Sequence, residues 1–78
     1  MILTLYGLYD IVDSAIATIS WHRNDDSARR FIVGQLSKSN LNLNDFRIIK
    51  VCSIEDTTGE IVENFNHQNI PLVIGDNK

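Results

Sequence analysis

Residues 46–65 read FRIIKVCSI, EDTTGE and IVENF in turn, and this stretch decides the fold. Residues 46–54 and 61–65 are rich in β-branched and aromatic side chains, which favour strands. The polar segment between them carries Gly59, which can take the left-handed conformation that a short hairpin loop built on a type I turn needs. The stretch therefore predicts an antiparallel hairpin.

The N-terminal part of the chain predicts a second strand pair. Residues 2–9 are apolar on both faces, which indicates a central strand, and Gly7 is expected to mark a bulge. Residues 10–14 have turn chemistry, and residues 15–21 alternate as a strand antiparallel to the first. The alternation divides that strand into two sides: Ala15, Ala17, Ile19 and Trp21 on one, and Ile16, Thr18 and Ser20 on the other.

A single helix is predicted between the two strand pairs. Residues 24–27 read NDDS, in which Asn24 or Asp25 can cap the free N–H groups of the first turn. Lys38 suits the negative end of the helix dipole. Helical spacing predicts one face that packs on a sheet, formed by Ala28, Phe31, Ile32, Gln35 and Leu36.

The elements add up to one α+β domain over residues 1–78, in the order β-β-α-β-β. We expect a mostly antiparallel sheet with the helix on one face. Residues 66–69 are predicted to form a polar loop, residues 70–74 could add a fifth strand at the edge, and residues 75–78 are predicted to be a frayed tail. The face without the helix still holds apolar residues, and a second subunit would bury them, so we expect a homodimer. We assign Ile16, Ile49, Val51 and Leu8 to that face.

The composition limits the class of partner. The net charge is −3, without the excess of Lys and Arg that sequence-independent nucleic-acid binders use to neutralise phosphates. The single cysteine, Cys52, excludes an intrachain disulfide. No signal peptide and no apolar stretch of membrane-spanning length is recognisable, so we expect a cytoplasmic protein with no membrane partner.

The sequence contains no motif for catalysis or for metal binding. His22, His67 and Cys52 lack the spacing of a zinc site, and phosphate-loop and nucleophile motifs are absent. Four carboxylates gather around the hairpin loop, where a solvated role is the simpler interpretation. We therefore expect neither an enzyme nor a cofactor. These carboxylates are Glu55, Asp56, Glu60 and Glu63.

The candidate nucleic-acid site consists of Trp21, His22, Arg23, Arg29 and Arg30. An exposed aromatic beside cations can stack on a base and bind its phosphate, so single-stranded DNA is the nucleic acid that this group would suit.

A structural interpretation of the same residues is also open. Asp25 and Asp26 lie four positions before Arg29 and Arg30, which is the spacing of helical salt bridges. Trp21 falls in step with the apolar residues of its strand, which favours a place in the core or an interface. The location of Trp21 discriminates between the two interpretations.

Three segments give the chain a resemblance to the small non-structural protein of gokushovirus-type microviruses, the single-stranded DNA phages. They are LYGLYD at residues 5–10, NDDSARRF at residues 24–31, and the Asp45-Phe46 step that leads into the hairpin IEDTTGEI at residues 54–61. The resemblance covers roughly residues 2–65. Members of that family often continue with Pro-rich sequence after the hairpin, whereas this chain has NHQN at residues 66–69.

The resemblance implies a role rather than a set of functional residues. In that family the protein is thought to be absent from the virion and to help switch replication from duplex DNA to single-stranded genome synthesis coupled to packaging. Some members are described as DNA-binding. The implied function is a non-enzymatic accessory protein, in the cytoplasm of an infected bacterium, that contacts single-stranded DNA or a phage or host replication protein. The alternative is a homodimeric protein–protein adaptor with no direct nucleic-acid contact.

Overall fold

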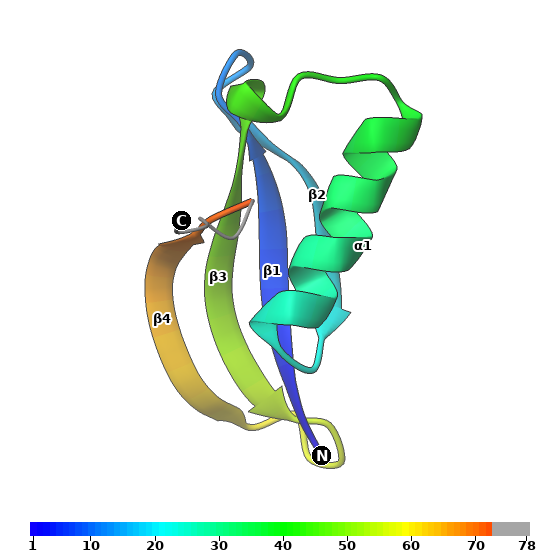
Figure 1. Ribbon diagram of the computed structural model, residues 1–78. Coiled ribbons are helices and arrows are strands. Elements are labelled where there is room, and N and C mark those ends of the chain that lie inside the picture. Colours follow the sequence, from blue (N-terminus) through cyan, green and yellow to red (C-terminus); the bar gives the residue numbers. More distant parts are fainter. Residues whose placement is uncertain (73–78) are drawn as a thin grey trace, which may run out of the picture.

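The computed structural model describes residues 1–72 and has the predicted α+β architecture (Figure 1). The order of elements along the chain is the one expected from the sequence. The elements are β1 (Ile2–Asp10), β2 (Ala15–His22), α1 (Asp25–Lys38), the 3₁₀ turn η1 (Leu43–Asp45), β3 (Phe46–Glu55) and β4 (Ile61–Ile70).

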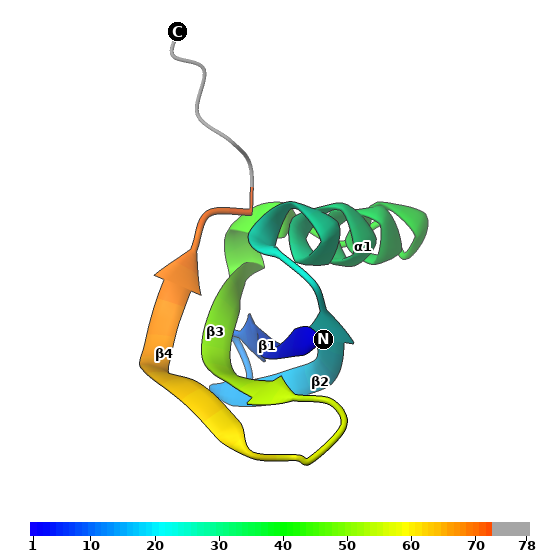
Figure 2. The same cartoon turned by 90° about the horizontal axis from the view of Figure 1, so that it is seen from below.

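The four strands form one antiparallel sheet in the order β2-β1-β3-β4. Helix α1 connects β2 to β3, which lie on opposite sides of β1. Strands β1 and β3 are therefore the two central strands, and β2 and β4 are the two edges. The sheet curves, and α1 lies on one side of it (Figure 2). We call the side under α1 the helix face and the opposite side the open face.

The hydrophobic core lies between the helix face and α1. Tyr6, Ile32 and Ile48 are its largest fully buried side chains. Ala28, Ile32 and Leu36 reach it because residues four apart share one side of a helix. Phe31 and Gln35, which were predicted on the packed side, are exposed, and Leu8, predicted on the other face, is buried in the core. The full core is Tyr6, Leu8, Ala28, Ile32, Leu36, Phe46, Ile48 and Ile70.

A bulge in the pairing of β1 with β2 changes the predicted faces of β2. Leu8 pairs with Thr18 but Tyr9 pairs with Ile16, so Ala17 is skipped. The side chain of Ile16 consequently lies over Gly7, where an added Cβ would come within 3.3 Å of its Cδ1 atom. Ile16 thus shares a face with Ile19, and the predicted alternation along β2 is wrong at its start. Bulges flank Gly7 on both sides of β1, between Leu8 and Tyr9 and between Leu5 and Tyr6.

The segment 66–69 lies inside β4, so the predicted loop there is wrong. Asn66 and His67 both take left-handed backbone conformations, with φ values of 54° and 61°. Asn and His are among the non-glycine residues that tolerate this region best. The strand therefore continues through an irregularity and ends at Ile70. No fifth strand occurs in residues 71–72, and residues 73–78, with the rest of the predicted edge strand and the predicted tail, lie outside the described residues.

The predicted turn of the hairpin loop and the predicted start of the helix are confirmed. Gly59 has a φ of 78°, and its N–H donates to the Glu55 carbonyl at 2.7 Å. The side chain of Asn24 caps α1 by accepting from the Ser27 N–H at 2.8 Å. Within residues 1–72, no helix has the length and apolar character needed to span a membrane.

Candidate interaction site

The open face of the sheet exposes a strip of large apolar side chains along β2. Ile16, Ile19 and Trp21 retain 46%, 60% and 45% of their surface. Trp21 and Ile19 pair with Leu5 and Gly7 of β1, and the side chain of Ile16 also lies over Gly7, so all three side chains stand on the side away from α1. We call these three residues the open-face strip.

The strip continues into half-buried apolar residues of the two central strands. Leu5 lies between Trp21 on one side and Cys52 on the other, and Ile49 pairs with Gly7. Trp21 is therefore not a core residue, although the core was one of the two places that its strand pattern favoured. Its side chain is exposed and can contact a partner.

His22 lies on the opposite side of β2 from Trp21. Its ring sits between those of Tyr6 and Phe31, with centroid distances of 5.8 and 5.2 Å. Ser20 Oγ lies 2.8 Å from His22 Nε2. Burial lowers the pKa of His22, which favours the neutral ring. His22 thus holds α1 against the edge of the sheet and faces away from the open-face strip.

The arginines of the candidate nucleic-acid site are also separated from Trp21. Arg29 is largely buried: its Nη1 atom binds Asp26 at 2.6 Å and its Nε donates to the Pro71 carbonyl at 2.8 Å. The predicted pairing of Arg29 with Asp25 is therefore wrong, and Asp26 pairs with Arg29 rather than with Arg30. Arg30 is exposed on α1.

Arg23 lies at the edge of a polar hollow at the start of α1. The hollow is lined by Thr4, Tyr6, Arg23, Asn24, Asp25, Asp26 and Lys50. Two carboxylates line the same hollow as Arg23, and the strand residues that line it, Thr4, Tyr6 and Lys50, belong to the helix face. The five predicted site residues do not form one surface.

A polar cluster in this hollow was missed by sequence reasoning. Tyr6 Oη donates to Asp25 Oδ1 at 2.5 Å, and Lys50 Nζ lies 3.2 Å from the same oxygen. Lys50 also lies over the Phe65 ring, 4.2 Å from its centroid. A lysine between the apolar residues Ile49 and Val51 was the available signal, since such a charge needs a partner when it is partly buried.

The electrostatics of the cluster stabilise the contact between α1 and the sheet. Burial by itself raises the pKa of Asp25, but the hydrogen bonds from Tyr6 and Lys50 outweigh it, and the pKa is lowered. Burial and the Asp25 carboxylate raise the pKa of the Tyr6 phenol, so Tyr6 remains a donor. A protonated phenol bound to an ionised carboxylate joins α1 to the sheet.

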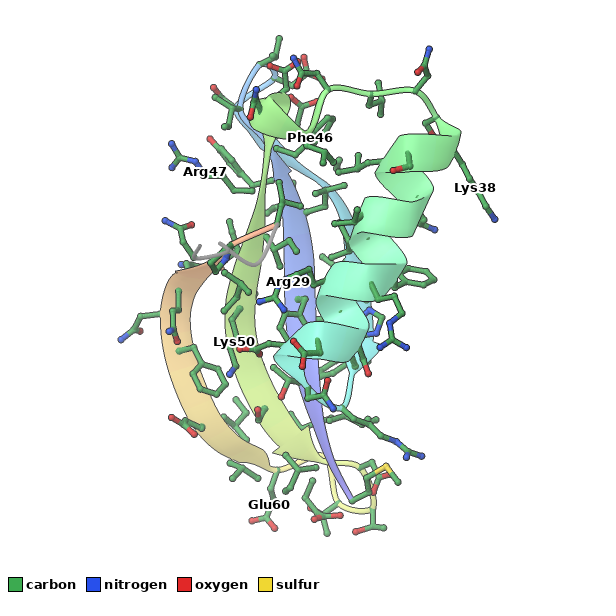
Figure 3. The ribbon with its side chains drawn as sticks, in the orientation of Figure 1. Arg29, Lys38, Phe46, Arg47, Lys50 and Glu60 are labelled. Carbon is green, nitrogen blue, oxygen red and sulfur yellow. The ribbon has the colours of Figure 1, made fainter. Side chains whose placement is uncertain are left out.

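The other basic side chains of residues 1–72 lie apart from one another (Figure 3). Figure 3 shows Lys38 at the far end of α1, Arg47 at the start of β3 and Lys50 close to the start of α1. Arg47 pairs with Tyr9 and Lys50 with Tyr6, which places the two cations on opposite faces of β3. In residues 1–72 no group of three or more His, Cys, Asp or Glu side chains could hold a metal ion.

No protein-family model, no curated protein and no solved structure matches the chain.

Proposed function

We propose that the protein is a non-enzymatic interaction module that binds protein through the open face of its sheet. The observation that carries the proposal is the open-face strip. A chain of 78 residues has a small core, and three large apolar side chains left in water on one strand reduce what burial can contribute to folding. Exposed apolar residues that gather on one surface are typical of binding sites.

The distribution of charge favours a protein partner over nucleic acid. The net charge is −3, and two cations at the start of α1 are already paired: Arg29 binds Asp26, and Lys50 binds Asp25. Strand β2 has no Asp, Glu, Lys or Arg side chain, and the open-face cation Arg47 lies two strands away, opposite Tyr9. Such a surface suits an apolar, uncharged protein surface, because β2 offers no cation that could neutralise a phosphate.

The resemblance to the gokushovirus-type non-structural protein supplies the biological setting of the proposal. In that setting the module acts in the cytoplasm of an infected bacterium as a replication or packaging accessory. Its protein partner would belong to the replication or packaging machinery.

Selection of binding peptides tests the proposed function. A displayed library of random peptides is selected against the wild-type protein, and the selected peptides are then measured against Trp21→Ala and Val12→Ala. Val12 is 72% exposed in the turn between β1 and β2, so it is a matched apolar control away from the strip. We expect the selected peptides to bind Val12→Ala like the wild type and Trp21→Ala about tenfold more weakly or worse. Failure to select any peptide, or equal binding to Trp21→Ala, would refute the proposal.

The exposure of Trp21 favours single-stranded DNA as a second candidate partner. A half-exposed indole can stack on a base, and exposed Arg23 and Arg30 could contact phosphates. Fluorescence anisotropy with a labelled oligothymidylate at low salt tests this function. If the protein has this function, it binds the oligothymidylate, and binding weakens in Trp21→Ala and in the Arg23→Ala/Arg30→Ala double variant. Absence of binding at tens of micromolar, or binding that neither change affects, rules it out.

A further inference from the structure

The two edges of the sheet differ in whether they can accept another strand. Every interior strand is paired on both sides, whereas the outer backbone groups of β2 and β4 have no partner strand in the described part of the chain. An unpaired edge can add a strand from another chain through main-chain hydrogen bonds.

The edge formed by β4 carries features that oppose strand addition. Its register shifts twice against β3, between Lys50 and Cys52 and between Ser53 and Ile54. Asn66 and His67 interrupt it in left-handed conformations. Bulges and charges, here Glu63, are the devices by which sheet edges avoid pairing.

The edge formed by β2 lacks these features from Thr18 to His22, since its one bulge, at Ala17, lies before this stretch. Residues 15–22 read AIATISWH, with no proline, no glycine and no Asp, Glu, Lys or Arg. From Thr18 to His22 the strand pairs with β1 in unbroken register. An uncharged, regular and largely exposed edge strand of this kind is a template for pairing.

We propose that β2 pairs antiparallel with β2 of a second copy, which joins the two sheets into one; this inference rests on the proposed protein-binding function. A two-fold axis through Ser20 opposes Ile19 of each copy to Trp21 of the other and keeps both open-face strips on the same side. Aromatic and β-branched residues are a favourable cross-strand pair. Since β2 has no charged side chain, two copies of a chain with net charge −3 meet there without opposing like charges.

The exposed area indicates how strong this association is. An aromatic side chain offers about 150–250 Å². Trp21 and Phe31, the latter beside His22 at the end of β2, are each exposed by nearly half. With Ile19 the available apolar surface is on the order of 300 Å² per copy, below the roughly 800 Å² per partner of a standard interface. The dimer is therefore weak and depends on protein concentration.

Sedimentation equilibrium over a range of protein concentrations, with two lysine variants, tests the proposal. Ile19→Lys places a charge in the proposed pairing site. Ile61→Lys makes the same change at a 69% exposed isoleucine on β4, which pairs with Ile54 and so lies on the same open face at the opposite edge. We expect the wild type and Ile61→Lys to dimerise alike and Ile19→Lys to raise the dissociation constant about tenfold or more.

Three results would overturn the edge pairing. They are a monomeric wild type at every concentration, dimerisation of Ile19→Lys equal to that of the wild type, and equal weakening by both lysine variants. Hydrogen exchange of the wild type gives a second measurement in case Ile19→Lys does not fold: the β2 amides must gain protection as concentration rises, and unchanged exchange also refutes the pairing. Peptide binding that persists in a strictly monomeric protein would refute the dimer and leave the proposed function standing.

Discussion

The two faces of the sheet differ in what their side chains do. On the helix face, Tyr6 and Ile48 are fully buried under α1, and even the polar side chains of Thr4 and Ser53 are buried and bonded to each other at 2.6 Å. On the open face, large apolar side chains of β2 remain exposed. Helix α1 covers only one face, and no element within residues 1–72 covers the other.

This difference separates stability from interaction within one small domain. The helix face contains the core and the polar cluster around Asp25, so changes there act on the free energy of unfolding. The open face contributes little to folding, so changes to its exposed residues act on binding. The following predictions compare the two faces directly.

The largest effect is expected from Ile32, which is 1% exposed in the core. Ile32→Ala should lower the free energy of unfolding by about 3 kcal/mol, because it removes buried methyl groups and leaves a cavity. Ile19→Ala, the same substitution on the open face, should cost less than about 0.5 kcal/mol in dilute solution. Urea denaturation at low protein concentration measures both. Similar losses for the two variants would mean that the open face is part of the folding core.

A smaller effect is expected from Asp25→Asn. The wild-type Asp25 pKa is lowered, so the stability that its charge contributes is present above the unfolded pKa of about 3.9 and is lost as pH falls through the folded value. Near pH 7 the variant should lose about 1 kcal/mol, and below the folded pKa the difference from the wild type should vanish.

Asp26→Asn is the matched control for this prediction. The Asp26 side chain is 75% exposed, and its pair with Arg29 is of the surface type that contributes at most about 1 kcal/mol. Urea denaturation across the acidic range should show a larger pH dependence of the difference from the wild type for Asp25→Asn than for Asp26→Asn. The reverse order would contradict the role given to the cluster of Tyr6, Asp25 and Lys50.

Among the changes at Ile32, Asp25 and Phe31, the smallest effect is expected at Phe31, which contacts His22 at the boundary between the two faces. Phe31→Leu keeps an apolar side chain but loses the aromatic pair, which contributes about 0.5 kcal/mol or somewhat more. Urea denaturation, together with the NMR shifts of the His22 ring, measures this loss. A loss as large as that of Ile32→Ala would mean that Phe31, although 47% exposed, acts as a core residue.

The parts of the fold that could be predicted are those with local signals. The hairpin loop depends on Gly59, the start of α1 depends on the Asn24 cap, and the α+β class follows from the order of the elements. Each of these features is determined by residues that are neighbours in the sequence.

The features that escaped prediction depend on residues far apart in the chain. The bulge that skips Ala17 results from pairing with β1, and it brings Ile16 to the same face as Ile19 and Trp21, which the alternation had placed on the other side. The partner that Asp25 selects, Lys50, comes from a different strand. The prediction of the candidate site was the least accurate, because Trp21 and His22 are adjacent in sequence but lie on opposite faces of the sheet, as neighbours in a strand do.

The fluorescence of Trp21 tests the central claim, that the open-face strip of one copy binds that of a second copy, most directly. Trp21 is the one tryptophan of the chain and belongs to the strip, so its emission reports on this surface alone. We predict that the emission shifts to the blue as protein concentration rises, because a second copy covers the indole, and that Ile19→Lys abolishes the shift. Emission characteristic of a water-exposed indole at every concentration, or a shift that Ile19→Lys retains, would contradict the account.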